Sequence, residues 1–90
     1  MHAALIAVTI DMEQLEAANA ALHDNVVPMV SAMPGFVAGY WLEPSDGAST
    51  AIVIFDTEAH ARAGTPAPGG APGAPVTINS VTFHEVAAHA

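Results

Sequence analysis

Histidine is the side chain of this sequence best suited to acid–base chemistry, because its ordinary pKa lies close to neutral pH. In the last strand that the sequence predicts, the polar residues able to face a ligand are Asn79, Thr82 and His84. His84 is the most useful of the three, since a neutral imidazole can accept a proton near neutral pH. We therefore predict His84 as a general base.

The segment from His84 to His89 (HEVAAH) is close to the HExxH pattern of zinc proteases but is one residue too long. Zinc needs histidines at i and i+4 on one face of a helix. His84 and His89 are five residues apart, in a predicted strand and its tail, which puts them on opposite faces. We predict no metal site and interpret His89 as an exposed residue of the tail.

Three further side chains are candidates for binding a ligand. Tyr40 and Trp41 are adjacent in a predicted strand and therefore point to opposite sides of it. One of them should belong to the core under the helices. The other should face the side of the sheet away from the helices, where it is either further core or a surface on which a ligand stacks. Asn19 lies near the edge of an apolar helical stripe, where its amide bonds to backbone or water, or donates to a ligand carbonyl.

Composition excludes several classes of function. The sequence has no cysteine and no lysine, which removes thiol nucleophiles, thiolate metal sites, Schiff bases and Walker-type phosphate loops. It contains no G-x-S-x-G, no G-x-G-x-x-G after a strand and no paired carboxylates at an obvious spacing. The acidic residues fall at predicted caps, turns and exposed helix faces, where they are mostly solubilising.

The charge balance limits the partners. The formal net charge is −8, and Arg62 is the one basic residue besides the histidines. Binding to nucleic acid or to an anionic membrane surface needs Lys and Arg, so neither is predicted. Met1 to Ile10 is apolar but far shorter than the roughly 20 residues of a membrane span, and it lacks the basic start and cleavage site of a signal peptide. We expect a reducing cytoplasmic setting.

The elements that must position these residues follow from local patterns. A first helix should begin at the cap Asp11, with Gln14 reaching back to it, and should kink or break at Pro28. Asp56 or Thr57 should cap a second helix ending at Ala63, with an ion pair between Glu58 and Arg62. The segments predicted as strands are Ala4–Ile10, Phe36–Leu42, Thr50–Phe55 and Val76–Val86. A turn is predicted at Glu43–Gly47. The Pro/Gly segment Thr65–Pro75 is predicted to be a connector or flap that holds neither helix nor strand.

This order, β-α-β-β-α-β, predicts one α+β domain over residues 1–90: a ferredoxin-like four-stranded antiparallel sheet with both helices on one face. The bare face would be apolar, because hydrophobic residues make up 52% of the chain and charged residues only 11%, against about 25% in an ordinary soluble domain. Soluble monomers rarely expose such a face. We therefore predict a homodimer joined through its sheet faces.

The chain resembles the dimeric α/β-barrel superfamily, among its small antibiotic-biosynthesis-monooxygenase-like members. The resemblance lies in Met33 to Trp41 (MPGFVAGYW) and in Ile52 to Ala63 (IVIFDTEAHARA). It implies a barrel formed by two chains and extends to cofactor-free oxygenases, haem-degrading enzymes, isomerases and proteins without known activity. His60 stands where the haem-degrading relatives carry their haem-binding histidine. They also need an asparagine on the first strand, where this chain offers only Thr9, so no cofactor is predicted and His60 stays a candidate for substrate binding.

Two functions follow as alternatives. The first is a cofactor-independent monooxygenase-like enzyme for a small aromatic or enolic substrate, with His84 as base, Trp41 or Tyr40 as stacking surface and Asn19 as orienting group. The second is a non-catalytic ligand-binding or scaffold dimer. A cavity of about 300 Å³ or more with convergent polar groups would favour an enzyme or a binder.

Overall fold

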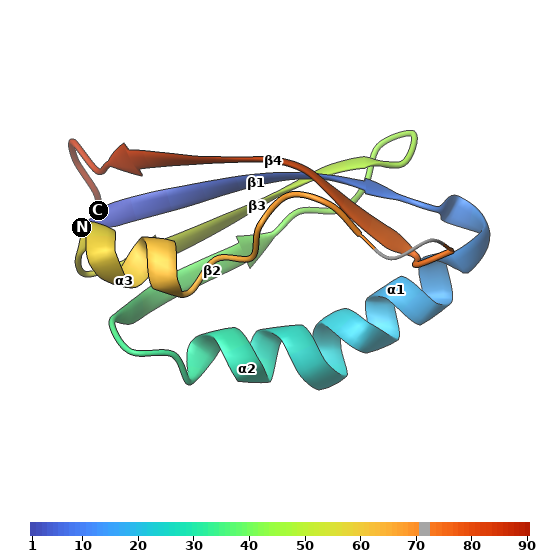
Figure 1. Ribbon diagram of the computed structural model, residues 1–90, viewed down its shortest axis with the longest axis horizontal. Helices are drawn as coiled ribbons and strands as arrows, with labels where there is room; N and C mark the ends of the chain where they lie inside the picture. Colours follow the sequence, from blue (N-terminus) through green and yellow to red (C-terminus); the bar gives the residue numbers. More distant parts are fainter. Residues whose placement is uncertain (71–72) are drawn as a thin grey trace.

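The computed structural model describes residues 1–70 and 73–90 of the 90-residue chain. It is an α+β structure in which helices cover one face of a four-stranded antiparallel sheet (Figure 1). The strands are β1 (His2–Ile10), β2 (Phe36–Trp41), β3 (Ala48–Phe55) and β4 (Val76–Glu85). The helices are η1 (Met12–Gln14), α1 (Leu15–Ala21), η2 (Leu22–Val26), α2 (Val27–Ser31) and α3 (Glu58–Ala63). The sheet order β2-β3-β1-β4 is compatible with the predicted ferredoxin-like fold.

The core lies between the sheet and the helices. Ala4 and Ile6 of β1 and Val53 of β3 point to this side and are buried. Phe55 at the end of β3 is 0% exposed, and its ring meets that of Phe36 edge to face at 6.3 Å between centroids. Alternate residues of β1 and β3 therefore supply the hydrophobic surface that holds the helices in place.

None of the helices in the described part of the chain lies on the opposite face of the sheet (Figure 1). The registers define rows that cross all four strands in the order β2, β3, β1, β4, and two of them are Tyr40–Ile52–Leu5–Thr82 and Ala38–Ile54–Ala3–His84. Each row starts apolar and ends polar. In these two rows the open face is apolar over β2, β3 and β1 and polar on β4, whereas Thr50 of β3 and Thr9 of β1 add hydroxyl groups nearer the other end of the sheet.

The start of the first helix confirms the predicted cap at Asp11 and the contact that Gln14 makes back to it. The Asp11 carboxylate caps it by accepting the Glu13 amide at 3.0 Å. Gln14 donates its side-chain amide to the other Asp11 carboxylate oxygen at 2.9 Å instead of accepting from the Asp11 backbone. The reason is that the Asp11 backbone N–H already donates to the Pro75 carbonyl at 2.9 Å. This bond ties the start of the helix to the start of β4.

Pro28 was predicted to kink or break the first helix. The structure has a π-helical segment, η2, directly before α2, and the Val27 N–H donates to the Leu22 carbonyl five residues back. Pro28 lies in the first turn of α2, where the amide it lacks is not needed. Pro28 has no N–H and cannot donate the i→i−4 hydrogen bond to the Asp24 carbonyl. The wider π-helical turn before it lets the helix continue without that bond.

Two turns fix the remaining connections. Asp46 and Gly47 have φ angles of 51° and 81°, which suit a tight hairpin turn between Ser45 and Ala48. In the connector predicted at Thr65–Pro75, Gly69 forms a β-bridge with Ile78 through bonds of 2.8 and 2.9 Å. Apart from this isolated bridge, the described residues of the segment hold neither helix nor strand, as predicted. Ala71 and Pro72 lie outside the described residues.

Candidate functional site

A cavity of about 500 Å³ lies between the sheet and the helices α1, η2 and α2. Its floor is apolar and comes from the helix-facing side of the sheet, including Ile6, Val8 and Ile78. Pro66 and Pro75, from the two ends of the connector, close one side. A volume of this size is typical of sites that hold a small molecule.

Trp41 forms an aromatic wall of this cavity. Gly39, two residues earlier on the same side of β2, makes room for the indole, because a Cβ built on Gly39 would come within 2.7 Å of the Trp41 ring. The indole therefore lies against the bare backbone of its own strand. A side chain at position 39 would push the ring into the cavity.

The polar groups of the cavity lie on two of its sides, the helical side and the side of the β2–β3 hairpin. Asn19 of α1 and His23 of η2 are four residues apart and line the helical side. Glu43 and Ser49 line the side formed by the β2–β3 hairpin. The Ser49 hydroxyl donates to the Leu42 carbonyl at 2.6 Å, so its lone pairs stay available as acceptors. An apolar chamber with a few hydrogen-bonding groups is what a specific small-molecule site requires.

The π-helical segment is part of the cavity wall, since Leu22, His23 and Val26 all line it. Segments of this kind occur inside α-helices mostly as single turns, frequently at functional sites. Here the segment that accommodates Pro28 also carries His23. The same π-helical turn therefore both accommodates Pro28 and places His23 in the wall of the cavity.

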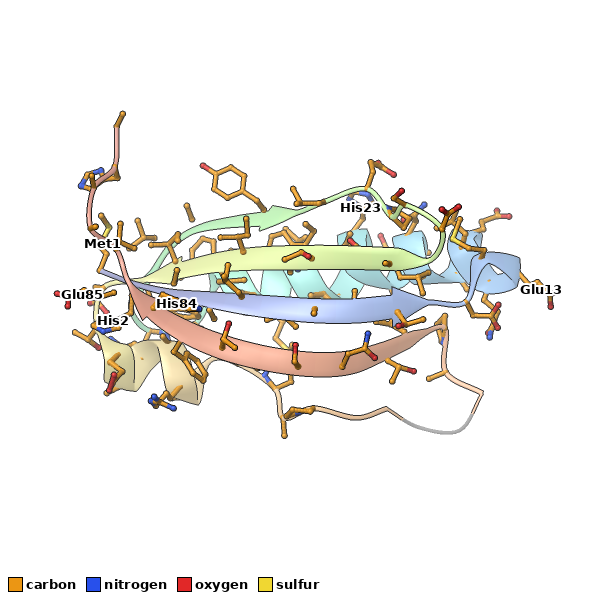
Figure 2. All side chains as sticks on the ribbon, turned by 90° about the horizontal axis from the view of Figure 1, so that it is seen from above. Met1, His2, Glu13, His23, His84 and Glu85 are labelled. Carbon is orange, nitrogen blue, oxygen red and sulfur yellow. The ribbon has the colours of Figure 1, made fainter. Side chains whose placement is uncertain are left out.

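The structure brings together only two of the five predicted site residues, Trp41 and Asn19. Tyr40 points to the open face of the sheet and is 58% exposed. His84 lies on that same face, where its Nε2 is 3.0 Å from the Thr82 hydroxyl. Figure 2 shows His84 near the end of the sheet that also holds Glu85, and His23 toward the other end. His84 is therefore separated from the cavity by the sheet itself.

His60 lies in a second, smaller hollow of about 220 Å³ with Met33, Pro34, Ala63 and Gly64. Its Nδ1 is 2.6 Å from the Asp56 carboxylate, and its backbone N–H donates to the Thr57 hydroxyl at 3.1 Å. The hydrogen bond from His60 holds the pKa of Asp56 below its usual value of 3.8. This site does not share a lining residue with the larger cavity.

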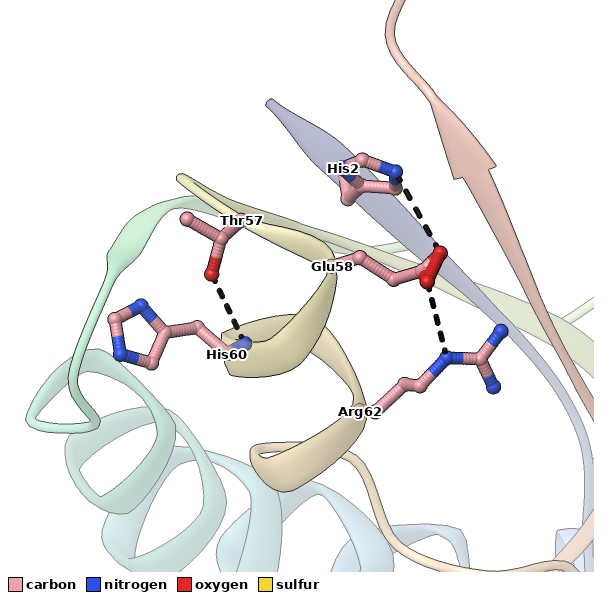
Figure 3. Close-up of polar contacts among 5 residues, drawn as sticks. All are labelled: His2, Thr57, Glu58, His60 and Arg62. Atoms are coloured by element: carbon pink, nitrogen blue, oxygen red, sulfur yellow. Dashed lines mark hydrogen bonds and ion pairs between the residues drawn. The ribbon is translucent and has the colours of Figure 1, made fainter.

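Arg62 is on the other side of α3 from the His60 ring (Figure 3). Its Nε is 3.8 Å from Glu58, as predicted, and the same carboxylate is 3.9 Å from His2 on β1. The guanidinium lies 4.4 Å from the centre of the Phe83 ring. The positive charge of Arg62 is thus held at the α3 end of the molecule by two partners and is not among the groups that line the larger cavity.

Within residues 1–70 and 73–90, no group of three or more His, Asp or Glu side chains is arranged to hold a metal ion. In the same part of the chain, no helix has both the length and the apolar character needed to cross a membrane. Comparison with protein families, with curated proteins and with solved structures found no match to this chain. The resemblance to the dimeric α/β-barrel superfamily therefore stays a prediction.

The sequence prediction missed His23, Glu43, Ser49 and Gly39 as residues of the site. His23 had a usable signal, because it is one helical turn from Asn19. Glu43 is two residues beyond Trp41 and so shares its side of an extended chain. Ser49 and Gly39 carried no chemical signal of their own, since their roles depend on the hairpin register and on where the indole lies.

Proposed function

We propose that this protein binds a small aromatic or enolic compound in the cavity between its sheet and its helices. The observation that carries the proposal is the cavity itself, at about 500 Å³ with Trp41 on one wall. Its apolar lining stabilises the body of such a ligand through removal of apolar surface from water. Asn19, His23 and Ser49 supply hydrogen bonds to oxygen atoms at the ligand's edge.

Trp41 and its neighbour Tyr40 offer a matched test, because they are adjacent in sequence and lie on opposite sides of the sheet. Calorimetric titration with naphthylmethanol, a neutral bicyclic probe, should give saturable binding to the wild-type protein. Trp41→Leu should lower the affinity for naphthylmethanol about three- to tenfold, which corresponds to the usual stabilisation by one aromatic pair. Tyr40→Leu should leave the affinity within twofold. Equal losses in both variants, or no binding to the wild type, would contradict the proposal.

A cofactor-independent oxygenase is the catalytic form of this function, and the position of His23 favours it. His23 is exposed at the rim of the cavity, and a neutral imidazole there can take the proton of a phenol or an activated methylene. The electron-rich anion then reacts with dioxygen. As the methylene becomes a carbonyl, one oxygen atom enters the product and the other leaves as water with the two hydrogens, so dioxygen is the sole oxidant. In this proposal His23 takes the role predicted for His84, because His84 lies across the sheet.

The two histidines separate this catalytic form from plain binding. The test substrate is anthrone, an aromatic ketone with an activated methylene that tautomerises to a phenol. The rate of oxygen consumption in its presence should fall at least tenfold in His23→Ala and stay unchanged in His84→Ala. Loss with His84→Ala alone would reverse the assignment. Binding without oxygen consumption would leave the non-catalytic binder, the alternative predicted from the sequence.

The proposal includes a homodimer joined through the open face of the sheet, as in the dimeric α/β-barrel superfamily, in a reducing cytoplasmic setting. The support is the apolar part of that face over β2, β3 and β1, where Leu5, Ile52 and Ile54 neighbour one another. Stable interfaces bury about 800 Å² per partner, which needs most of such a face. The polar residues of β4 would then form the rim.

A further inference from the structure

The cavity that we propose as the ligand site has one carboxylate and no Arg or Lys among the described residues that line it. The carboxylate belongs to Glu43, which is exposed at the cavity's edge and forms no ion pair with any described residue. The sequence has no lysine, and its single arginine, Arg62, is held by Glu58 and Phe83 on and beside α3. Among the described residues that line the cavity, no permanently positive side chain is therefore present to receive an anionic ligand.

We propose that the cavity takes aromatic compounds that carry a protonated amine and rejects those that carry a carboxylate or a phosphate. This proposal rests on the proposed function and names the class of ligand. The aromatic ring would lie against the indole of Trp41, and the ammonium group would lie between that ring and the Glu43 carboxylate. A cation is attracted both by the face of an indole and by a carboxylate.

The spacing along the hairpin suits such a ligand. Trp41 ends β2, and the chain continues extended, because the Leu42 N–H still donates to the Thr50 carbonyl at 3.1 Å. Residues two apart in an extended chain are on the same side and about 7 Å from one another. An amine on a one- or two-carbon arm would span that distance from a ring stacked on Trp41.

The charge of the whole molecule acts in the same direction. The formal net charge is −8, and a field of this sign raises the local concentration of cations and lowers that of anions. Because Glu43 lies at the edge of the cavity, part of its attraction is screened by salt. The preference for a cation should therefore decrease as ionic strength rises.

Three probes of nearly equal shape test the proposal: naphthylmethylamine, naphthylmethanol and naphthalene carboxylate. Near neutral pH they are cationic, neutral and anionic. Trp41 is the only tryptophan, so its indole N–H gives a single resonance in isotope-labelled protein that reports on the cavity. We expect the amine to bind about fivefold or more tightly than the alcohol, and the carboxylate to bind more weakly than the alcohol. The ratio between amine and alcohol should fall toward one at high salt.

Glu43→Gln should bring the affinity ratio between amine and alcohol down to about the value at high salt. Glu85→Gln is the matched control, since it removes the same charge at the far end of the sheet (Figure 2) and should preserve the ratio. Binding of the alcohol without preference for the amine, or equal ratios in the two variants, would overturn this inference and leave the proposed function standing. Failure of all three probes to shift the Trp41 resonance would overturn the proposed function as well.

Discussion

Gly35 is the residue on which the contact between β2 and α3 depends. Its φ is +79°, and its backbone carbonyl accepts the Asp56 N–H at 2.8 Å. The paired side chains of Asp56 and His60 lie directly over its Cα, so a Cβ at this position would collide with both. The glycine is therefore needed twice, for its left-handed backbone and for the space above it.

Gly35→Ala should destabilise the fold by about 1–3 kcal/mol more than Gly73→Ala does. The control is close, because Gly73 has a φ of +77° but no heavy atom of the described residues within 4 Å of its would-be Cβ. Both variants bear the backbone cost of about 1–2 kcal/mol, and only Gly35→Ala adds the collision. Urea unfolding of each variant measures the two losses. Equal losses would show that the Asp56–His60 pair moves aside without cost.

The Asp56 carboxyl gives a second prediction at this scale. Its hydrogen bond from His60 lowers its pKa in the folded state below the usual 3.8. A lowered folded pKa means that the pairing stabilises the fold above the unfolded pKa, and that this stabilisation is lost as the pH falls through the lowered value. Carboxyl NMR titration of His60→Ala should show the Asp56 midpoint moving up toward 3.8.

Asp11 is an internal control for that titration. Its pKa is also lowered, but by the Gln14 side chain and the Glu13 amide at the other end of β1. The midpoint of Asp11 should therefore be the same in the wild type and in His60→Ala. An unchanged Asp56 midpoint in the variant would mean that His60 is not the cause of the shift.

At the scale of elements, α3 depends on its cap. It is six residues long, too short to persist by its own backbone bonds, and the Thr57 hydroxyl accepts the His60 N–H at its start. Thr57→Ala should cost about 1 kcal/mol in unfolding free energy, and Thr57→Ser should recover most of it. Hydrogen exchange at the His60 amide should accelerate in Thr57→Ala alone. Equal exchange rates in both variants would exclude the cap as the cause.

The elements were predictable because their signals are local. Pro34 and Gly35 end one helix, Asp46 and Gly47 turn a hairpin, and nearly continuous apolar runs mark β1, β2 and β3. The π-helical segment was not predictable, since the sequence shows only that Pro28 must interrupt the helix and not how the backbone adapts. The bridge from Gly69 to Ile78 was missed because nothing at Gly69 indicates a partner nine residues later.

The site was only half predictable for a different reason. Alternation places Tyr40 and Trp41 on opposite sides of a strand but does not say which side the helices cover. That choice decides that Trp41 enters the cavity with Asn19, while Tyr40 and His84 face away. Which polar groups converge depends on the packing of a helix against a hairpin, and no single segment of sequence encodes it.

For the whole molecule, the sheet separates two surfaces with different tasks. One side carries the cavity, and the other carries the apolar face on which the proposed dimer depends. Because no side chain of Leu5, Ile52 or Ile54 lines the cavity, changes on the open face should not alter its shape. Self-association and ligand binding should therefore be separable by mutation.

Ile52→Glu tests this separation, since Ile52 lies in the middle of the open face between Tyr40 and Leu5. Sedimentation of the wild type should give twice the 9.1 kDa mass of the chain. Ile52→Glu should give the mass of one chain, because an unpaired carboxylate buried at the interface strongly destabilises the dimer. Ser80→Glu, among the polar residues of β4, should stay dimeric. The Ile52→Glu monomer should still shift its Trp41 resonance on binding naphthylmethanol. A wild type of single-chain mass would contradict the dimer, and a monomeric variant that is folded but no longer binds would contradict the independence of the two surfaces.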